Sequence, residues 1–277
     1  MSDRKVTLIG ENGARLVLAC AEETYRLAND PGLWGGSTIT HSSRRIGNIP
    51  GRRLEDVHPE PRIIPLPVRV AATTEQEADD GLAGLSRVLY GGPCAIRFER
   101  PDGTAREITA DYLTGFDKVA IEDNLGTRWN RVPLVFKAYD PYWRSITEDA
   151  GLYAASIPDG QVAQIDHIDI TNDGDVDTWP EWTFTAPAEA IELMNLNTGR
   201  LFRVQEVFTI GDELRIETDP AGRGVWLNDV ERWDLFSPGR DFWPLVPGLN
   251  RILVRGVSVE ATIGDYTLRW VVRNQTV

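Results

Sequence analysis

Apolar and polar residues alternate in short stretches along most of the chain, which is the pattern of half-buried β-strands. Near the N-terminus, the stretches KVTLIG and RLVLACA flank an Asn-Gly pair, and this order predicts a hairpin. CAIRFE and AREITADYL, on either side of RPDG, predict a second hairpin. From residue 161 onwards similar stretches follow one another, from QIDHIDIT to YTLRWVV, joined by turns. Regularly spaced short strands of this kind predict a β-sandwich.

One segment, residues 74–90, has the helical period instead. Thr74 and Glu77 have the spacing of a capping box, acidic residues fill the first turns, and Gly-Gly-Pro at 91–93 ends the segment. We therefore predict one helix at about residues 74–90. Its apolar stripe consists of Ala78, Leu82, Leu85 and Leu89.

Residues 28–61 follow neither period and are rich in Gly, Pro, Ser and Arg. A connection of this length without periodicity is usually functional or is ordered by a partner. We therefore predict an extended, irregular arm at about 28–61, with Trp34, which lies between glycines, as a candidate interface residue. Four further candidate interface residues give the arm a basic character: Arg44, Arg45, Arg52 and Arg53.

The stretch RIIPLPVRVAA follows the arm and reads as a strand with one apolar face. Pro65 and Pro67 fall on its other face. Because proline cannot donate a backbone hydrogen bond, we expect this strand to lie at a sheet edge or to have an interrupted ladder. Its apolar face consists of Ile64, Leu66, Val68 and Val70.

The strand pattern of WNRVPLVFKAYD stops at the aromatic-rich segment DPYW, residues 140–143, and helical periodicity does not return beyond it. A chain of 277 residues is too long for one small sandwich and sufficient for two domains of ordinary size. We therefore predict two domains, residues 1–145 and 146–277.

The charge and the apolar content of the chain limit the kinds of molecule or membrane that it can bind. The formal net charge is −13 and the isoelectric point is about 4.8, which argues against a nucleic-acid-binding surface and against a polybasic membrane contact. We expect neither a signal peptide nor a membrane span, because no apolar run has the required length. Cys20 and Cys94 lie in strand-like segments, where buried free thiols are favoured and a disulfide stays open.

A search for catalytic or metal-binding patterns gives little. His41, His58 and His167 are far apart, and none has a metal-ligand spacing with Cys or carboxylates. NDGDVDTW, residues 172–179, lacks the Gly and Glu that a calcium loop needs, so a polar turn is favoured. No nucleophile elbow, P-loop or dinucleotide fingerprint is present, and HSS at 41–43 has no catalytic context. We expect no enzyme activity, cofactor or metal.

Tryptophan can fill a core, or it can anchor sugars and protein partners. For Trp182 and Trp270, which lie within strand-like stretches, we favour the core. Trp34 is left open between the core and an intermolecular role. Trp243, in GRDFWPLVPG, is either exposed between prolines or covered by a loop.

The order of several segments resembles the distal tail protein family of long-tailed, non-contractile bacteriophages, also described as minor tail or tail-hub proteins. In the N-terminal half, the resemblance lies in RFERPDGTAREITADYL and in RWNRVPLVFKAYDPYWRS. In the C-terminal half it lies in ITNDGDVDTWPEWTFTAP, with Asn172, Gly174 and Pro180 at the matching positions, and in PGLNRILVRG and YTLRWVVRNQ. The resemblance implies an N-terminal β-sandwich-like domain with one helix and an arm, and a C-terminal galectin-like β-sandwich.

The resemblance also implies a structural role in the virion. Six copies would form a ring at the distal end of the tail, between the tail tube protein and a tail-tip, baseplate-hub or tail-associated protein, with receptor-binding proteins attached in some members. DNA would pass through the lumen without specific binding. The protein would be made and assembled in the cytoplasm of the host bacterium, and no membrane contact is implied.

Within this role, the segment Asp140, Pro141, Tyr142 and Trp143 is interpreted as a domain-boundary latch. Pro141 would end the strand ladder, and Tyr142 and Trp143 would close the bottom of the first core. Two alternatives remain: a carbohydrate-binding tail adhesin that recognises host-wall glycans, which needs a polar face with an exposed Trp, and a wall hydrolase, which needs a deep acidic cleft.

Overall fold

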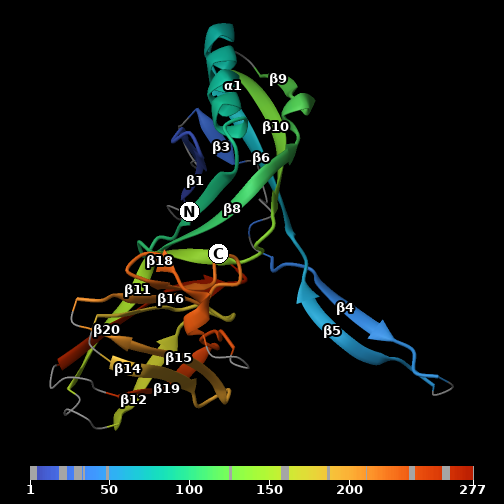
Figure 1. Cartoon of the computed structure of the whole chain (residues 1–277). Helices are drawn as coiled ribbons and strands as arrows, with labels where there is room; N and C mark the ends of the chain where they lie inside the picture. Colours follow the sequence, from blue (N-terminus) through green and yellow to red (C-terminus); the bar gives the residue numbers. More distant parts are fainter. Residues whose placement is uncertain are drawn as a thin grey trace. The chain divides into compact units, whose positions relative to one another are not determined.

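The computed structural model describes residues 5–18, 24–27, 33, 35–47, 50–124, 127–156, 162–185, 188–209, 211–236, 241–257 and 263–276. The chain divides into two compact units, residues 1–146 together with 274–277, and residues 147–273. Most described residues lie in antiparallel strands, and α1 (Glu75–Leu89) is the one α-helix among them (Figure 1). The predicted fold class, mainly β with one helix, is therefore confirmed.

The described residues of the first unit form eleven strands, the last of which continues into the second unit. They are β1 (Lys5–Gly10), β2 (Arg15–Leu18), β3 (Tyr25–Leu27), β4 (Ile39–Arg44), β5 (Arg53–Pro59), β6 (Arg62–Ala72), β7 (Cys94–Glu99), β8 (Ala105–Thr114), β9 (Ala120–Asn124), β10 (Thr127–Ala138) and β11 (Trp143–Ser156). A short 3-10 helix, η1 (Phe116–Lys118), follows β8.

Strand β8 joins two groups of strands in this unit. Residues 105–110 of β8 pair with β7, which pairs with β1, and β1 pairs with β2. Residues 111–114 pair with β10, which also pairs with β9 and β6. Both hairpins that the sequence predicted, β1–β2 and β7–β8, are confirmed. The inward residues of both groups of strands form one core cluster with the helix. This cluster includes Leu8, Ile64, Leu85, Ile96 and Phe136.

Helix α1 begins as the capping box predicts. The Glu77 backbone N–H donates to the Thr74 hydroxyl, and the Glu77 carboxylate accepts from the backbone N–H of Thr74. The carboxylate also accepts from Thr73, at 2.6 Å from its hydroxyl, and these hydrogen bonds lower the pKa of Glu77. The helix packs on β6, and Val70 approaches it so closely that a Cβ at Gly81 would lie 2.5 Å from the Val70 side chain.

The expectation of an edge position for the proline-containing strand is only partly right. Strand β6 pairs along its whole length with β10, and on its other side the described residues of β3 pair with residues 68–70. Pro67 lies opposite Pro133; because neither has an N–H, this pair is not hydrogen-bonded, and the backbone of Pro67 faces away from β10. Both prolines therefore lie outside the described pairing of β6 with β3.

The predicted irregular arm is corrected by the structure, because much of it is regular. Strands β4 and β5 form a separate two-stranded antiparallel sheet. The register shifts at a β-bulge between Ser42 and Ser43, so Leu54 and Val57 on the opposite strand are three residues apart instead of two. This extra residue breaks the period-2 pattern, which explains why the sequence did not predict the hairpin.

The second unit contains a β-sandwich. One sheet has the order β18–β17–β16–β13–β20 and the other β12–β19–β14–β15. The strands are β12 (Val162–Asn172), β13 (Glu181–Phe184), β14 (Ala188–Asn195), β15 (Arg200–Phe208), β16 (Leu214–Glu217), β17 (Gly224–Leu227), β18 (Val230–Glu231), β19 (Gly248–Val257) and β20 (Ile263–Asn274). A 3-10 helix, η2 (Trp233–Leu235), follows β18.

The core of the second unit lies between these two sheets. Trp182 and Ile216 contribute from the first sheet, and Leu193, Val204 and Ile252 from the second. Trp182 is 1% exposed and Trp270 packs partly buried against the same cluster, as predicted for both. Trp243 is also 1% exposed, which excludes the alternative of an exposed side chain.

Candidate functional site

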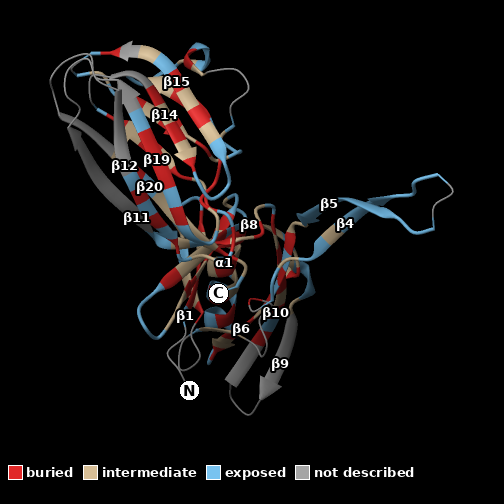
Figure 2. Cartoon of the chain, turned by 90° about the horizontal axis from the view of Figure 1, so that it is seen from below, coloured by how far each residue is buried: buried red, intermediate tan, exposed pale blue. Residues whose placement is uncertain are grey.

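The β4–β5 hairpin, here called the arm hairpin, is exposed on both faces. Every residue of β5 is exposed, and in β4 only Thr40 is partly covered. Figure 2 shows the hairpin almost entirely in the colour of exposed residues. An isolated two-stranded hairpin is at best marginally stable in water. A hairpin without a core on either face therefore needs a further source of stabilisation.

One face of the arm hairpin carries its apolar residues. Residues directly opposite in an antiparallel pair lie on the same face. Ile39, His41 and Ser43 alternate along β4, and they lie opposite Pro59, Val57 and Leu54 respectively. Ile39, Leu54 and Val57 are 48%, 55% and 46% exposed. The apolar residues of β5 and Ile39 therefore share one solvent-facing surface.

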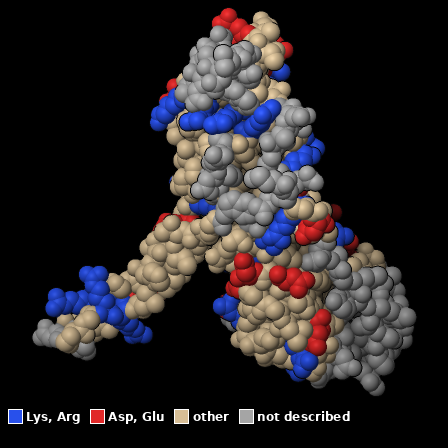
Figure 3. All heavy atoms as spheres, turned by 180° about the vertical axis from the view of Figure 1, so that it is seen from behind, with Lys and Arg blue, Asp and Glu red and all other residues tan. Residues whose placement is uncertain are grey.

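The other face and the tip are polar and basic. Arg44 lies directly opposite Arg53, so two like charges meet across the ladder. Residues 39–59 contain four Arg and two acids, which gives +4 − 2 = +2 against −13 for the whole chain. Lys and Arg side chains gather near the end of the arm in Figure 3. The arm is thus a basic segment of an acidic protein.

The tip also contains a hollow of about 590 Å³. Ile46 and Leu54 supply apolar lining, and the remaining lining is mostly charged. The charged lining residues are Arg44, Arg45, Arg53 and Glu55. The hollow suits a partner side chain that combines an apolar stem with an acidic end. Arg52 is described and exposed but does not line it, and Trp34 lies outside the described residues.

The root of the arm is held by a buried arginine. Arg62, at the start of β6, is 3% exposed. One of its Nη2 hydrogen bonds goes to the Leu33 carbonyl at 2.7 Å, and Nη2 also donates to the Gly35 carbonyl. Its Nη1 donates to the Gln275 carbonyl at 2.8 Å. Burial lowers the pKa of this guanidinium. Both ends of the arm segment therefore meet at one side chain.

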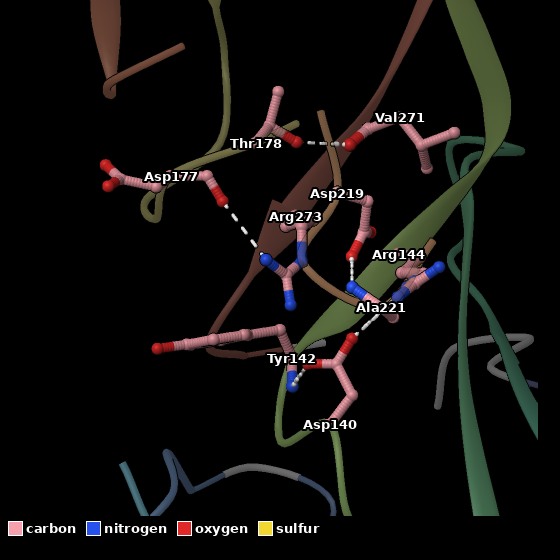
Figure 4. Close-up of polar contacts among 9 residues, drawn as sticks. All are labelled: Asp140, Tyr142, Arg144, Asp177, Thr178, Asp219, Ala221, Val271 and Arg273. Atoms are coloured by element: carbon pink, nitrogen blue, oxygen red, sulfur yellow. Dashed lines mark hydrogen bonds and ion pairs between the residues drawn. The ribbon is translucent and has the colours of Figure 1, made fainter. Parts of the chain in front are cut away.

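The segment predicted to be a domain-boundary latch lies between β10 and β11. Trp143 is fully buried in the first core cluster, and the Arg62 guanidinium lies 5.6 Å from its ring centroid. Asp140 accepts from the Tyr142 backbone N–H at 3.4 Å and from Arg144 Nη2 at 2.8 Å (Figure 4). These contacts close a tight turn around Pro141, which is itself buried.

The asparagines that carried the family resemblance are structural. Asn172 is 1% exposed and donates through Nδ2 to the carbonyls of Val176 and Leu245, both at 3.0 Å. A Cβ at Gly174 would lie 2.2 Å from the Arg273 carbonyl oxygen, so only glycine fits. Asn250 is fully buried and binds the backbone of Val246 through both of its polar atoms. The motif therefore organises turns of the sandwich.

No catalytic or metal-binding arrangement is visible in the part of the chain that the structure describes. There, no group of three or more His, Cys, Asp or Glu side chains is placed to hold a metal ion. His58 lies 3.2 Å from Asp56 on the exposed arm hairpin, and His41 is exposed on the opposite strand. Cys94 is a buried free thiol whose pKa is raised by burial, and Cys20 lies outside the described residues.

The second unit carries one exposed tryptophan that the sequence did not single out. Trp233 in η2 is 46% exposed. Its indole N–H donates to Glu231 at 2.7 Å, and its ring meets Phe242 edge to face at 6.0 Å. Next to it, Arg232 makes two hydrogen bonds of 2.8 Å to Asp234. This surface combines a fixed aromatic ring with polar groups.

Among the described residues, no helix has both the length and the apolar character to cross a bilayer.

The family model described as siphovirus-type tail component, C-terminal domain, matches residues 173–270. A search of curated proteins gave no match.

Solved structures resemble the chain over nearly its whole length. The crystal structure of SPP1 Dit (gp 19.1), described as a paradigm of the hub adsorption apparatus in phages that infect Gram-positive bacteria, aligns with 97% of this chain and 98% of its own. The identity is 14% and the TM-score 0.67. Two structures of the phage p2 baseplate in its activated conformation, with strontium and with calcium, align with 96% of this chain and 97% of theirs at 10% identity and a TM-score of 0.46. The likeness to SPP1 Dit shows a shared fold.

Proposed function

We propose that this chain is a structural hub of a phage tail that forms a ring of six copies. The match of residues 173–270 to a siphovirus-type tail component and the fold shared with SPP1 Dit support this proposal. The ring joins the tail tube to the tail tip or baseplate, and DNA passes through its lumen. The first unit forms the ring, and the second unit offers its surface to other tail proteins. The observation that carries this proposal is the amphipathic arm hairpin.

The arm hairpin has the properties of a ring contact. A closed ring of identical subunits needs two different surfaces on each subunit, one to give and one to receive. The apolar face with Ile39, Leu54 and Val57 has nothing to bury it within the described chain. Burying it against the next copy would supply the stabilisation that the isolated hairpin lacks.

The charge distribution favours a second copy as the occupant. Residues 39–59 carry +2, so the remainder of the chain carries −13 − 2 = −15. A basic arm is therefore attracted to the body of any neighbouring copy. The same acidic excess repels phosphate, which suits a lumen through which DNA slides without binding.

The first test is the mass of the purified full chain in solution by light scattering, followed by negative-stain imaging. Six copies of 30.9 kDa give 6 × 30.9, about 185 kDa, with a central hole. Because assembly of a ring can require the tube as a template, the measurement is repeated with the tube protein added.

Two single variants assign the contact to the apolar face. Val57→Asp places a charge on that face and should abolish assembly. Ser42→Asn changes the opposite face, where Ser42 pairs with Asp56, without adding a charge, and serves as the control that should assemble. Equal assembly of both variants, or a monomer under both conditions for the unmodified chain, contradicts the proposed ring.

A glycan-binding adhesin is a second candidate, favoured by the exposed Trp233 and the polar groups around it. A flat indole can stack on the apolar face of a sugar ring, and the neighbouring carboxylates and Arg232 can bind its hydroxyls. A glycan array probed with the full chain tests this candidate. Binding that Trp233→Ala removes supports it, and an array without binding excludes it.

A further inference from the structure

The last residues of the chain, 274–277, belong to the first unit although they follow the last strand of the second. Asn274 is 4% exposed. The Gln275 carbonyl accepts from Arg62, and the Thr276 carbonyl accepts from Arg106. The terminal segment is therefore bound to the first unit through consecutive backbone groups.

Arg62 joins this terminal segment to the arm. Its guanidinium donates to the carbonyls of Leu33 and Gly35, which precede the arm hairpin, while Arg62 itself is the third residue after the hairpin. The same group donates to Gln275 and lies over the Trp143 ring. One buried side chain thus contacts three segments that are far apart in the sequence, around residues 33–35, 143 and 275.

The hydrogen bonds of the buried Arg62 guanidinium depend on the positions of its acceptors. The hydrogen-bond acceptors that the structure places on Arg62, within the residues it describes, are backbone carbonyls. A buried guanidinium is costly unless its donors are satisfied. If the Gln275 carbonyl is removed, Arg62 loses one of its three backbone acceptors, and a buried donor is left without a partner unless the guanidinium and the Leu33–Gly35 segment that it holds shift.

We propose that Arg62 and the segment 274–276 form a clamp that fixes the direction of the arm hairpin. The clamp rests on the proposed function only for its purpose, which is to aim the arm at the next copy. Because Gln275 directly follows β20, the arm is fixed only after the last strand of the second unit has folded. The clamp therefore couples folding of the C-terminal domain to readiness for assembly.

The test measures the arm in the monomer by double electron–electron resonance. Spin labels are attached at Ser43→Cys in β4 and at Asp79→Cys on α1, both exposed positions, with Cys20 and Cys94 replaced by Ala. The full-length chain should give a single narrow distance peak. A chain that stops after Asn274, which leaves β20 complete, should lose this peak and give a broad distribution.

Two controls separate the clamp from other causes. Gln275→Ala keeps the backbone carbonyl and should retain the narrow peak. Arg62→Met should broaden the distribution at least as much as the truncation does, because it removes the hydrogen bonds to Leu33 and Gly35 as well as the one to Gln275. The truncation added to Arg62→Met should broaden it little further, because the Arg62–Gln275 hydrogen bond is already gone. If Arg62→Met does not fold, the comparison of the truncated chain with Gln275→Ala still tests the clamp.

A narrow peak in the truncated chain overturns the clamp, as does equal broadening by Gln275→Ala. These distances are measured before assembly, so they do not depend on whether a ring forms. Conversely, the truncated chain can give a broad distance distribution while the full-length chain forms no ring. That pair of results confirms the clamp and contradicts the ring. The two proposals therefore fail separately.

Discussion

The first unit contains two hairpins with the same antiparallel pairing and different surroundings. In β7–β8, buried and partly buried residues alternate along β7, and Ile96 and Phe98 belong to the core cluster. In β4–β5, the arm hairpin, nearly every residue is exposed. Backbone pairing is therefore not what distinguishes a stable hairpin from a dependent one. The difference is whether one face of the ribbon is covered.

The cross-strand charges follow the same division. Arg97 lies opposite Glu107 in β7–β8, and its Nε and Nη2 donate to one carboxylate oxygen at 3.0 and 2.8 Å. In the arm hairpin, Arg44 lies opposite Arg53. Opposite charges across a ladder stabilise a hairpin and like charges destabilise it. The arm hairpin therefore has charges that weaken it alone, which suits a partner that supplies the acids.

The largest expected effect concerns the core that supports β7–β8. Trp143 is fully buried in this core, and Trp143→Ala should lower the free energy of unfolding by about 3–5 kcal/mol. Tyr139→Ala, four residues earlier and 64% exposed, is the control and should have little effect. Denaturant unfolding measures both. An unchanged midpoint for Trp143→Ala would also remove the interpretation of this segment as a latch.

The hairpins can be compared directly by one truncation in each. Ile96→Ala in β7 removes a fully buried side chain and should cost about 2–5 kcal/mol. Leu54→Ala in β5 removes a side chain that is 55% exposed and should change the unfolding free energy of the monomer by less than about 0.5 kcal/mol. The same Leu54 variant should weaken assembly. A large loss in the Leu54→Ala monomer would mean that the hairpin is already covered within one chain.

The sequence predicted the supported hairpin and missed the dependent one for a physical reason. CAIRFE alternates along its whole length, and AREITADYL alternates from Ile108 through Ala110 to Tyr112, because a core selects one face of each strand. In the arm, the bulge separates Leu54 and Val57 by three residues, and no core enforces the period. The basic arginines were still visible in the sequence. The clamp was not, because the Leu33, Gly35 and Gln275 carbonyls belong to the backbone and leave no signature in residue type.

A charge swap should reverse the electrostatic part of the comparison. Arg53→Glu creates an opposite-charge pair with Arg44 and should stabilise the arm hairpin by about 0.2–1 kcal/mol. Glu107→Arg creates a like-charge pair with Arg97 and should destabilise β7–β8 by a similar amount. Amide hydrogen exchange of each hairpin measures the change. Arg53→Glu should at the same time weaken assembly, and a variant that assembles better would show that the arginines do not face acids.

The smallest expected effect is the pH dependence of the turn that closes β7–β8. The Asp102 carboxylate accepts from the Thr104 hydroxyl at 2.6 Å and from the Thr104 backbone N–H at 2.9 Å, and these bonds lower the pKa of Asp102. A carboxyl with a lowered folded-state pKa stabilises the fold above its ordinary pKa, and this stability is lost as the pH falls through the folded-state value. Asp102→Asn should therefore lower the urea midpoint slightly at neutral pH and leave it unchanged in strong acid. The effect is small because Asp102 is exposed and water screens it. A difference that is constant with pH would assign the contribution of Asp102 to turn geometry instead of charge.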